Sequence, residues 1–298
     1  MIFHNFAELQ TYCEQHGITL AQAFIGQETA NSGITTAELY EHMEEQLNIM
    51  EASVERGRAG VISHSGMSGL DAMKMAQSGK PKLAGAAFFT ALTNAIAVNE
   101  VNAAMGVICA APTAGSSGIV PGILTAFAPV LGLERQSQLD YLITAAGIGM
   151  IIGNNATLSG AAGGCQAEIG SAAAMAAGAL VEAAHGIPRQ SLQAVAMAMK
   201  NMLGLSCDPV AGLVEIPCIK RNAGGTAIAL AAAEMALAGV ESRIPCDEVI
   251  EAMWKIGQSM PDTLKETARG GLAMTETGRR LNDQLRQTVR IAGRRQTE

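Results

Sequence analysis

Three of the six cysteines in this chain stand beside residues that interrupt regular structure. Cys165 follows a Gly-Gly pair, Cys207 precedes Asp-Pro, and Cys218 follows a proline. Because glycine and proline stop helices and strands, we expect these side chains to point into a cavity and not to pack on a helical face. Cys165 also precedes an alanine-rich run, so the N–H groups and dipole of a helix starting there stabilise its thiolate.

The spacing of these cysteines matches neither a CxxC pair nor a zinc finger. A structural zinc protein is disfavoured, because its ligands normally come in paired CxxC knuckles. Three soft ligands from separate loops suit an iron–sulfur cluster with one iron left open to a substrate. The remaining cysteines, which lack this loop context, are assigned no role: Cys13, Cys109 and Cys246.

Four long sequence blocks between residues 98 and 281 are far more specific than any three-letter motif. They are VNEVNAAMGVICAAPTAGSSGIVPG (98–122), NNATLSGAAGGCQAEIGSAAAMAAG (154–178), NMLGLSCDPVAGLVEIPCIKRNA (201–223) and MPDTLKETARGGLAMTETGRRL (260–281). Through them the chain resembles the α subunit of the iron–sulfur-dependent L-serine dehydratases (L-serine ammonia-lyases) whose α and β parts are separate polypeptides.

The resemblance implies a [4Fe-4S] cluster held by Cys165, Cys207 and Cys218, and no pyridoxal phosphate. The open iron would act as a Lewis acid on the hydroxyl of L-serine, which is converted to pyruvate and ammonia. A separate β subunit is the implied partner. Some single-chain relatives supply a fourth ligand from a C-terminal cysteine, but no cysteine follows Cys246 here. The fourth site is therefore open, or the β partner or a small molecule fills it.

The segment PTAGSSG (112–118) is the candidate site for the substrate carboxylate. Its backbone N–H groups and the hydroxyls of Thr113, Ser116 and Ser117 offer donors, especially if a helix starts near Ile119. Arg221, just past Cys218, either holds the carboxylate bidentately or balances the charge of the cluster.

The base that removes the Cα proton has several candidates. Residues 57–82 form a predicted loop rich in glycine and serine, in which Ser63, His64 and Ser65 offer two hydroxyls and an imidazole to bind substrate or move a proton. His64, Lys220 and a residue of the β subunit all stay open as the base. Two other functions stay open as well: a related lyase acting on L-cysteine or L-threonine, and a non-catalytic subunit that only holds the cluster.

Helical periodicity with glycine and proline breaks predicts an all-α protein with a single helical domain. Hydrophobic residues make up 49% of the 298 residues, charged residues 16%, and there are 33 glycines, which favours helices in close contact. Helices are expected at 83–111, 137–158 and 190–204. We expect residues 1–56 to form a helical segment that covers the core or faces a partner, and residues 57–298 to carry the cluster.

Composition also limits the partners and the compartment. A net charge of −7 argues against nucleic-acid binding. The uncharged stretches Ala103–Leu133 and Tyr141–Ala167 are long enough to span a bilayer, but prolines, glycines and asparagines interrupt them, so a buried core and no membrane insertion are predicted. The N-terminus lacks the apolar region of a secretory signal, and the cysteines show no close pairing, which together predict a cytoplasmic protein.

Overall fold

The computed structural model describes residues 2–295, with side chains described up to residue 287. Thirteen α-helices and several short helical turns make up this part of the chain. Its only β-type pairing is an isolated bridge between Ile62 and Gly69. The prediction of an all-α fold is confirmed.

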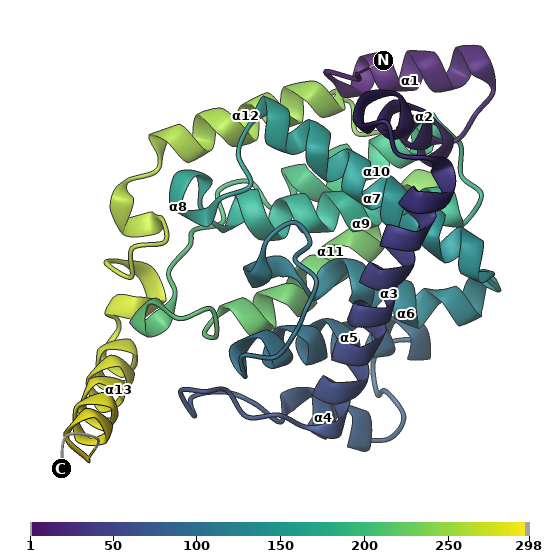
Figure 1. The fold of residues 1–298 in the computed structure, drawn as a ribbon. Helices are drawn as coiled ribbons and strands as arrows, with labels where there is room; N and C mark the ends of the chain where they lie inside the picture. The colour runs from purple at the N-terminus through teal and green to yellow at the C-terminus, as the bar shows by residue number, and fades with distance from the viewer. Residues whose placement is uncertain (1, 296–298) are drawn as a thin grey trace.

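The helix α9 (Ser171–Ala183) lies at the centre of the molecule (Figure 1). Every residue from Ser171 to Val181 is buried, as expected for a helix that is apolar or small on all sides. A Cβ atom on Gly178 would lie 2.6 Å from Ile148 Cδ1, so glycine at this position allows the close approach of the neighbouring helix. Four helices pack around α9: α6 (Ile119–Leu131), α7 (Arg135–Asn155), α10 (Pro188–Lys200) and α11 (Cys218–Leu237).

The helix α5 (Ala86–Ala103) packs against α3 (Thr36–Ala59), α6 and α11, with the short α4 (Asp71–Gln77) beside it. The predicted helix 83–111 is too long at its C-terminal end, because α5 ends at Ala103. Met105 adopts a left-handed conformation, with φ of 57°, and the Gly106 N–H donates to the Val101 carbonyl at 2.8 Å. This bond closes the helix in the manner of a Schellman cap, and the chain continues without helical structure to the loop at 112–118.

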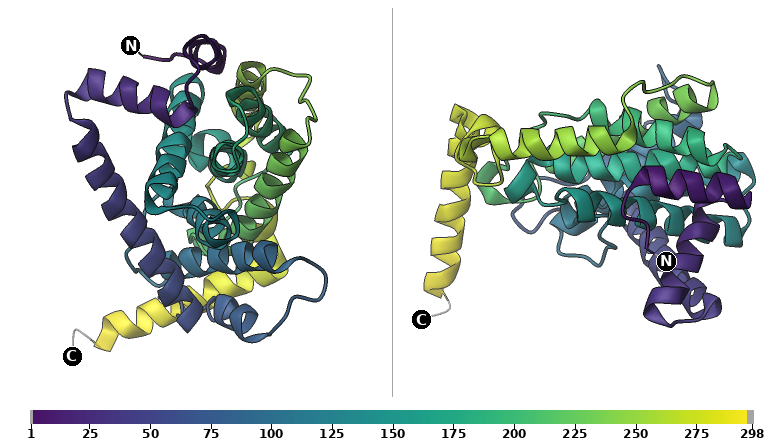
Figure 2. Two further views of the ribbon diagram at one scale, coloured as in Figure 1. Left: turned by 90° about the vertical axis from the view of Figure 1, so that its right-hand side faces the viewer. Right: turned by 90° about the horizontal axis from the view of Figure 1, so that it is seen from above.

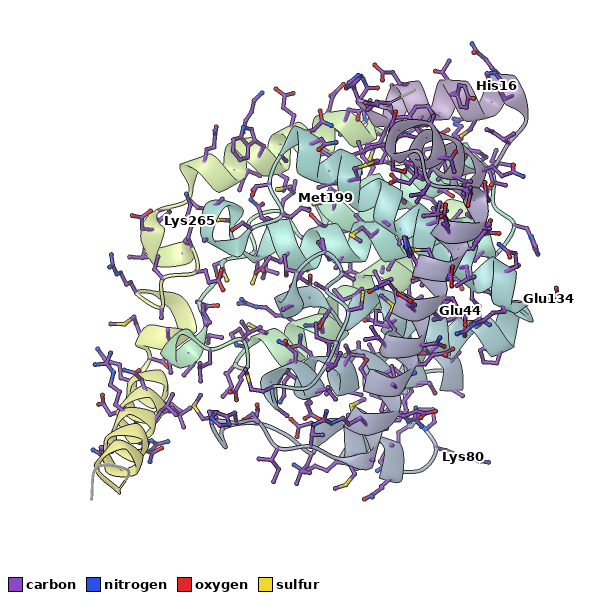
Figure 3. All side chains as sticks on the ribbon, viewed as in Figure 1. His16, Glu44, Lys80, Glu134, Met199 and Lys265 are labelled. Atoms are coloured by element: carbon purple, nitrogen blue, oxygen red, sulfur yellow. The ribbon has the colours of Figure 1, made fainter. Side chains whose placement is uncertain are left out.

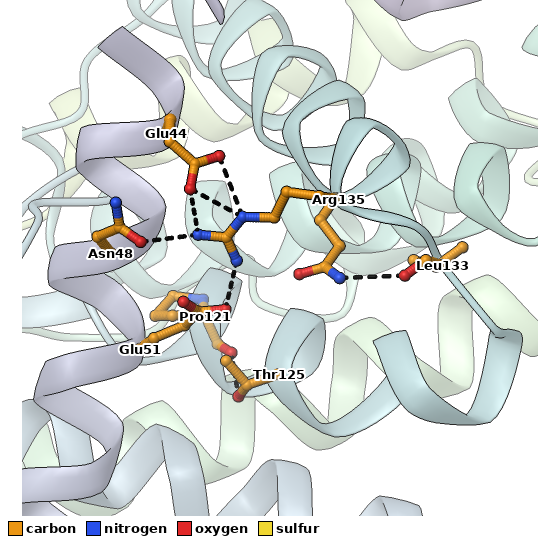
Figure 4. A network of polar contacts seen from close by, with 8 residues as sticks. Glu44, Asn48, Glu51, Pro121, Thr125, Leu133 and Arg135 are labelled. Atoms are coloured by element: carbon orange, nitrogen blue, oxygen red, sulfur yellow. Dashed lines mark hydrogen bonds and ion pairs between the residues drawn. The ribbon is translucent and has the colours of Figure 1, made fainter. Parts of the chain in front are cut away.

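The N-terminal helices are α1 (Phe6–His16), α2 (Leu20–Ser32) and α3 (Thr36–Ala59). The helix α3 continues three residues past position 56, so the expected boundary falls in its last turn. Arg135 at the start of α7 binds α3 through Glu44 at 2.7 Å, Asn48 at 2.8 Å and Glu51 at 2.6 Å (Figure 4). This network joins the N-terminal helices to the rest of the bundle.

The C-terminal helices are α12 (Cys246–Ser259), which lies on the bundle, and α13 (Glu276–Arg295), which projects away from it (Figure 2). Between them, residues 260–275 run along the end of the bundle in two short turns, η4 (Asp262–Leu264) and η5 (Gly271–Met274). Figure 3 shows Met199 inside the bundle, whereas the charged side chains of Lys80, Glu134 and Lys265 point outward from its edges.

One described stretch, Ala114–Leu131, is long and apolar enough to cross a membrane by length and composition. Within it, however, the regular α-helix α6 has 13 residues, or about 20 Å, whereas a membrane span needs about 20 residues. Packing against α5 and α9 buries 61% of the stretch. These properties are those of a core helix, as the interruptions in the sequence predict.

Candidate active site

The three predicted ligand cysteines come from three separate elements. Cys165 precedes a π-helical turn, η2 (Gln166–Gly170), that runs into α9; Cys207 lies in a non-helical segment; and Cys218 is the first residue of α11. Their side chains are 2%, 2% and 7% exposed. All three cysteines are therefore buried, and each lies outside or at the start of a regular helix, as the neighbouring glycines and prolines predict.

Packing brings two of these thiols, Cys165 and Cys207, together with a carboxylate. The ligand atoms of Cys165, Glu168 and Cys207 all lie within 4.8 Å of one another, and the Cys207 thiol is 3.9 Å from Glu168 Oε2. Cys218 lies close enough for the charge of Cys165 to affect it. Glu168 has no predicted role in the sequence, although its position one turn after Cys165 is a signal that places it on the same side of the helical run.

The protonation of the thiols follows from these contacts. A hydrogen bond from Cys207 and the nearby guanidinium of Arg221 hold the pKa of Cys165 below its ordinary value despite burial. The pKa of Cys207 is raised, because it donates to Cys165 and is buried. Burial and the charge of Cys165 raise the pKa of Cys218 to about 12. Of the three thiols, Cys165 is therefore the one whose surroundings favour the thiolate, the form that ligates metal.

Arg221 reaches the Cys165 sulfur from the first turn of α11. Its Nη1 lies 3.4 Å from Cys165 Sγ and 2.8 Å from the Ser206 carbonyl, and its Nη2 lies 2.8 Å from Asp208 Oδ1. The geometry corresponds to the charge-balancing role. Binding of a substrate carboxylate by Arg221 stays a prediction and has to use its remaining donors.

The segment between α12 and α13 covers the cysteines. The Cys207 N–H donates to the Leu264 carbonyl at 2.8 Å, and the Leu272 N–H donates to Asp208 Oδ2 at 2.7 Å. Asp208 therefore connects Arg221 to this C-terminal segment. Asp208 was missed as a site residue, although it directly follows a cysteine that was singled out.

The predicted carboxylate loop lies beside Glu168. Thr113 donates its hydroxyl to Glu168 Oε1 at 2.8 Å. Ser116 and Ser117 are fully buried, and their hydroxyls donate within the loop, to the carbonyls of Ala111 at 3.3 Å and Ala114 at 2.9 Å. Two buried amides hold the loop in place: Asn99 donates to Ala114 and Gly115 carbonyls, and Asn222 donates to Gly115 and accepts from the Gly118 N–H. The helix α6 begins at Ile119, as predicted.

The loop that carries His64 is held by a second carboxylate. Ser65 and Ser68 donate to Glu215 Oε2 at 2.9 and 2.7 Å, and Ser63 Oγ lies 3.2 Å from Ser65 Oγ. The His64 side chain is exposed. Its backbone N–H donates to the Ala103 carbonyl at 3.0 Å, which fixes the loop against the end of α5.

The other predicted base, Lys220, lies on the side of α11 that faces α4. Its ammonium group forms an ion pair with Asp71, and the side chain is 60% exposed. Glu100, which is buried, accepts the Asp71 and Ala72 N–H groups at 2.8 and 3.2 Å and so holds the start of α4. Within the described chain, neither Lys220 nor His64 forms a hydrogen bond with a cysteine.

The donor set fits an iron–sulfur cluster. Three buried thiols from separate segments are the ligands such clusters require, and a guanidinium beside them offsets their negative charge. The other cysteines lie elsewhere: Cys13 and Cys246 pack in the core, and Cys109 donates to Gln46 Oε1 at 3.0 Å. Among the cysteines, the three predicted thiols are therefore the candidate ligands for such a group.

Comparisons with known proteins identify the family of the chain. The family described as the serine dehydratase alpha chain matches residues 15–273. The chain is 52% identical to a probable L-serine dehydratase alpha chain of Bacillus subtilis over 95% of both chains. It is 42% identical to the L-serine dehydratase alpha chain of Peptoniphilus asaccharolyticus, over 92% of this chain and 95% of that one. It is 37% identical to L-serine dehydratase 2 of Escherichia coli, over 91% of this chain but 61% of the longer E. coli protein. The chain therefore belongs to the serine dehydratase alpha chain family.

Proposed function

We propose that this chain is the α chain of an iron–sulfur-dependent L-serine dehydratase that converts L-serine to pyruvate and ammonia. The observation that carries the proposal is the convergence of Cys165, Cys207 and Cys218 next to the loop 112–118. The names of the relatives supply the substrate. A zinc structural site accounts less well for thiols that come from three separate elements beside a polar loop.

In this proposal the three cysteines hold a [4Fe-4S] cluster, which when bound supplies an open iron as Lewis acid for the departing hydroxyl. The loop 112–118 binds the substrate carboxylate. Its Ala114 and Gly115 N–H groups have no hydrogen-bond partner in the described chain, and the Thr113 hydroxyl lies next to them. Donors of this kind suit a carboxylate. Ser116 and Ser117 act by holding the loop in shape.

We assign the removal of the Cα proton to His64 in preference to Lys220. The Lys220 ammonium is engaged in an ion pair with Asp71, and an ammonium group has no lone pair with which to accept a proton. The His64 imidazole is exposed on a loop whose serines are held by Glu215, and a neutral imidazole has one ring nitrogen that can accept a proton.

A separate β chain is the proposed partner. The term alpha chain in the relatives' names and the extra length of the E. coli protein support it. We propose that residues 1–56 help to form the surface that faces this partner, and that the enzyme works in the cytoplasm. The six cysteines are all free thiols, which suits a reducing compartment and a cluster sensitive to oxygen.

The test is anaerobic co-purification with the β chain, followed by iron and sulfide analysis and a pyruvate assay with L-serine. Cys165→Ser, Cys207→Ser and Cys218→Ser should each abolish both the bound iron and the turnover. Cys109→Ser, which changes a half-buried cysteine bonded to Gln46, serves as the matched control and should keep both. Pyruvate formation without iron, or retention of iron by the three variants, would overturn the proposal.

A further inference from the structure

Glu168 is a carboxylate without a cationic partner in the described chain. One oxygen accepts the Thr113 hydroxyl at 2.8 Å, and the other has only the 3.9 Å contact with the Cys207 thiol. Arg221, the cation that contacts the cysteines, is already bound to Asp208 and to Cys165. Glu168 is half-buried, and a carboxylate partly removed from water is costly unless it is paired or well hydrogen-bonded, so a cation would stabilise this position.

Two glycines flank the Glu168 carboxylate. A Cβ atom on Gly115 would lie 3.5 Å from Glu168 Oε1, and a Cβ atom on Gly160 would lie 3.2 Å from Cys207 Sγ and collide with Glu168 Oε2. The walls on these two sides are therefore backbone, with no side chain to cover the carboxylate. The carboxylate lies between the loop 112–118 and the cysteines.

We propose that Glu168 binds the α-ammonium group of the amino-acid substrate, an inference that rests on the proposed function. The carboxylate and ammonium groups of an amino acid share one carbon, so their binding sites must be adjacent. Thr113 provides this adjacency, because it belongs to the loop 112–118 and its hydroxyl contacts Glu168. The hydroxyl of the substrate then extends toward the cysteines on the other side of Glu168.

This role makes Glu168 a specificity residue. An ammonium group offers three donors to the carboxylate, and charge-assisted hydrogen bonds of this kind are about twice as strong as neutral ones. A hydroxy acid without the ammonium group leaves the half-buried Glu168 carboxylate without a cationic partner. The site would therefore select amino acids over hydroxy acids of the same size.

Two alternatives compete with the assignment of Glu168 to the substrate ammonium group. Glu168 lies within 4.8 Å of two thiols and is itself a potential iron ligand. Glu266, exposed on the covering segment, is a second carboxylate whose charge reaches Glu168 and is the other candidate for the ammonium group. The iron content of Glu168→Gln tests the first alternative, and the matched variant Glu266→Gln tests the second.

The experiment uses the anaerobically purified α–β holoenzyme and two non-reacting or slow ligands. L-Alanine has the ammonium and carboxylate groups, and 3-hydroxypropanoate has the hydroxyl and carboxylate groups without the ammonium. Their dissociation constants are measured by calorimetry for the wild type, Glu168→Gln and Glu266→Gln, together with iron content and the visible absorption of the cluster. We expect Glu168→Gln to weaken L-alanine binding about 10- to 100-fold, to change 3-hydroxypropanoate binding less than about 3-fold, and to keep its iron. Glu266→Gln should change neither.

Several outcomes would overturn the assignment of Glu168 to the substrate ammonium group. Equal loss of both ligands, no loss of either, or a larger effect of Glu266→Gln overturns the assignment of Glu168 while the wild type still turns over L-serine. Loss of iron in Glu168→Gln identifies the residue as a cluster ligand and also overturns it. A wild-type holoenzyme that neither binds L-alanine nor forms pyruvate contradicts the proposed function itself.

Discussion

Arg135 and Arg221 each bind carboxylates, but in very different surroundings. Arg135 is 37% exposed and contacts Glu44 and Glu51, each 39% exposed, across the seam between α3 and α7 (Figure 4). Arg221 is 16% exposed and contacts Asp208, which is 4% exposed. The first network joins two helices, and the second touches a thiol that is predicted to hold the cluster.

The comparison shows that burial changes the role of an ion pair between an arginine and a carboxylate. Exposed ion pairs gain little, because water and salt screen them. A buried pair gains little overall as well, yet removal of one member leaves the other charged and unpaired in the interior. Arg221 and Asp208 are therefore coupled to each other, to Cys165 and to the covering segment, whereas Arg135 acts locally.

The largest effect is expected for Arg221→Gln, which leaves Asp208 buried without its cation. We expect the free energy of unfolding to fall by about 3–5 kcal/mol, measured by urea denaturation of the purified chain. The iron content after anaerobic reconstitution should fall too, because Cys165 loses the guanidinium beside it. Arg221→Lys keeps the charge but not the planar fork, so an intermediate loss is expected. A loss below about 1 kcal/mol for Arg221→Gln would mean that the two arginine networks are equivalent.

Asp208→Asn should have a smaller effect, because the amide keeps an oxygen that can accept a hydrogen bond. We expect a loss of about 1–3 kcal/mol and faster hydrogen exchange at the Leu272 amide, which donates to Asp208. Amides in α3, which lie outside this network, should exchange at the wild-type rate. Unchanged exchange at Leu272 would show that Asp208 does not hold the covering segment.

Arg135→Gln should have the smallest effect, roughly a quarter or less of that of Arg221→Gln, because its partners are exposed. The hydrogen bond from Arg135 lowers the pKa of Glu44 below its usual 4.5. A carboxyl group whose pKa is lower in the folded than in the unfolded state stabilises the fold at any pH above its unfolded-state pKa. This contribution to stability is lost as the pH falls through the folded-state pKa. The difference in melting temperature between wild type and Arg135→Gln should therefore shrink from pH 7 to pH 3.5. A difference that stays constant or grows would contradict this sign.

Several features could be predicted from the sequence because their causes are local. The all-α fold follows from helical periodicity, and Thr35 caps α3 through reciprocal hydrogen bonds with Glu38, three residues further along the chain. The cysteines and the loop 112–118 were recognised because glycine, proline and hydroxyl residues mark loops, and the loop does lie beside the cysteine region. The end of α5 was missed, because the left-handed conformation of Met105 has no signal in its residue type.

Only tertiary packing determined which charged groups share the site. Arg221 is 56 positions from Cys165, and its contact with that thiol depends on how α11 packs against α9 and η2. Glu168, Asp208 and Glu215 read in sequence as ordinary acidic residues, yet each becomes a buried or half-buried acceptor in the fold. Residue types and their local spacing specify helices and loops. The burial that leaves Glu168 without a cation exists only after those elements have packed together.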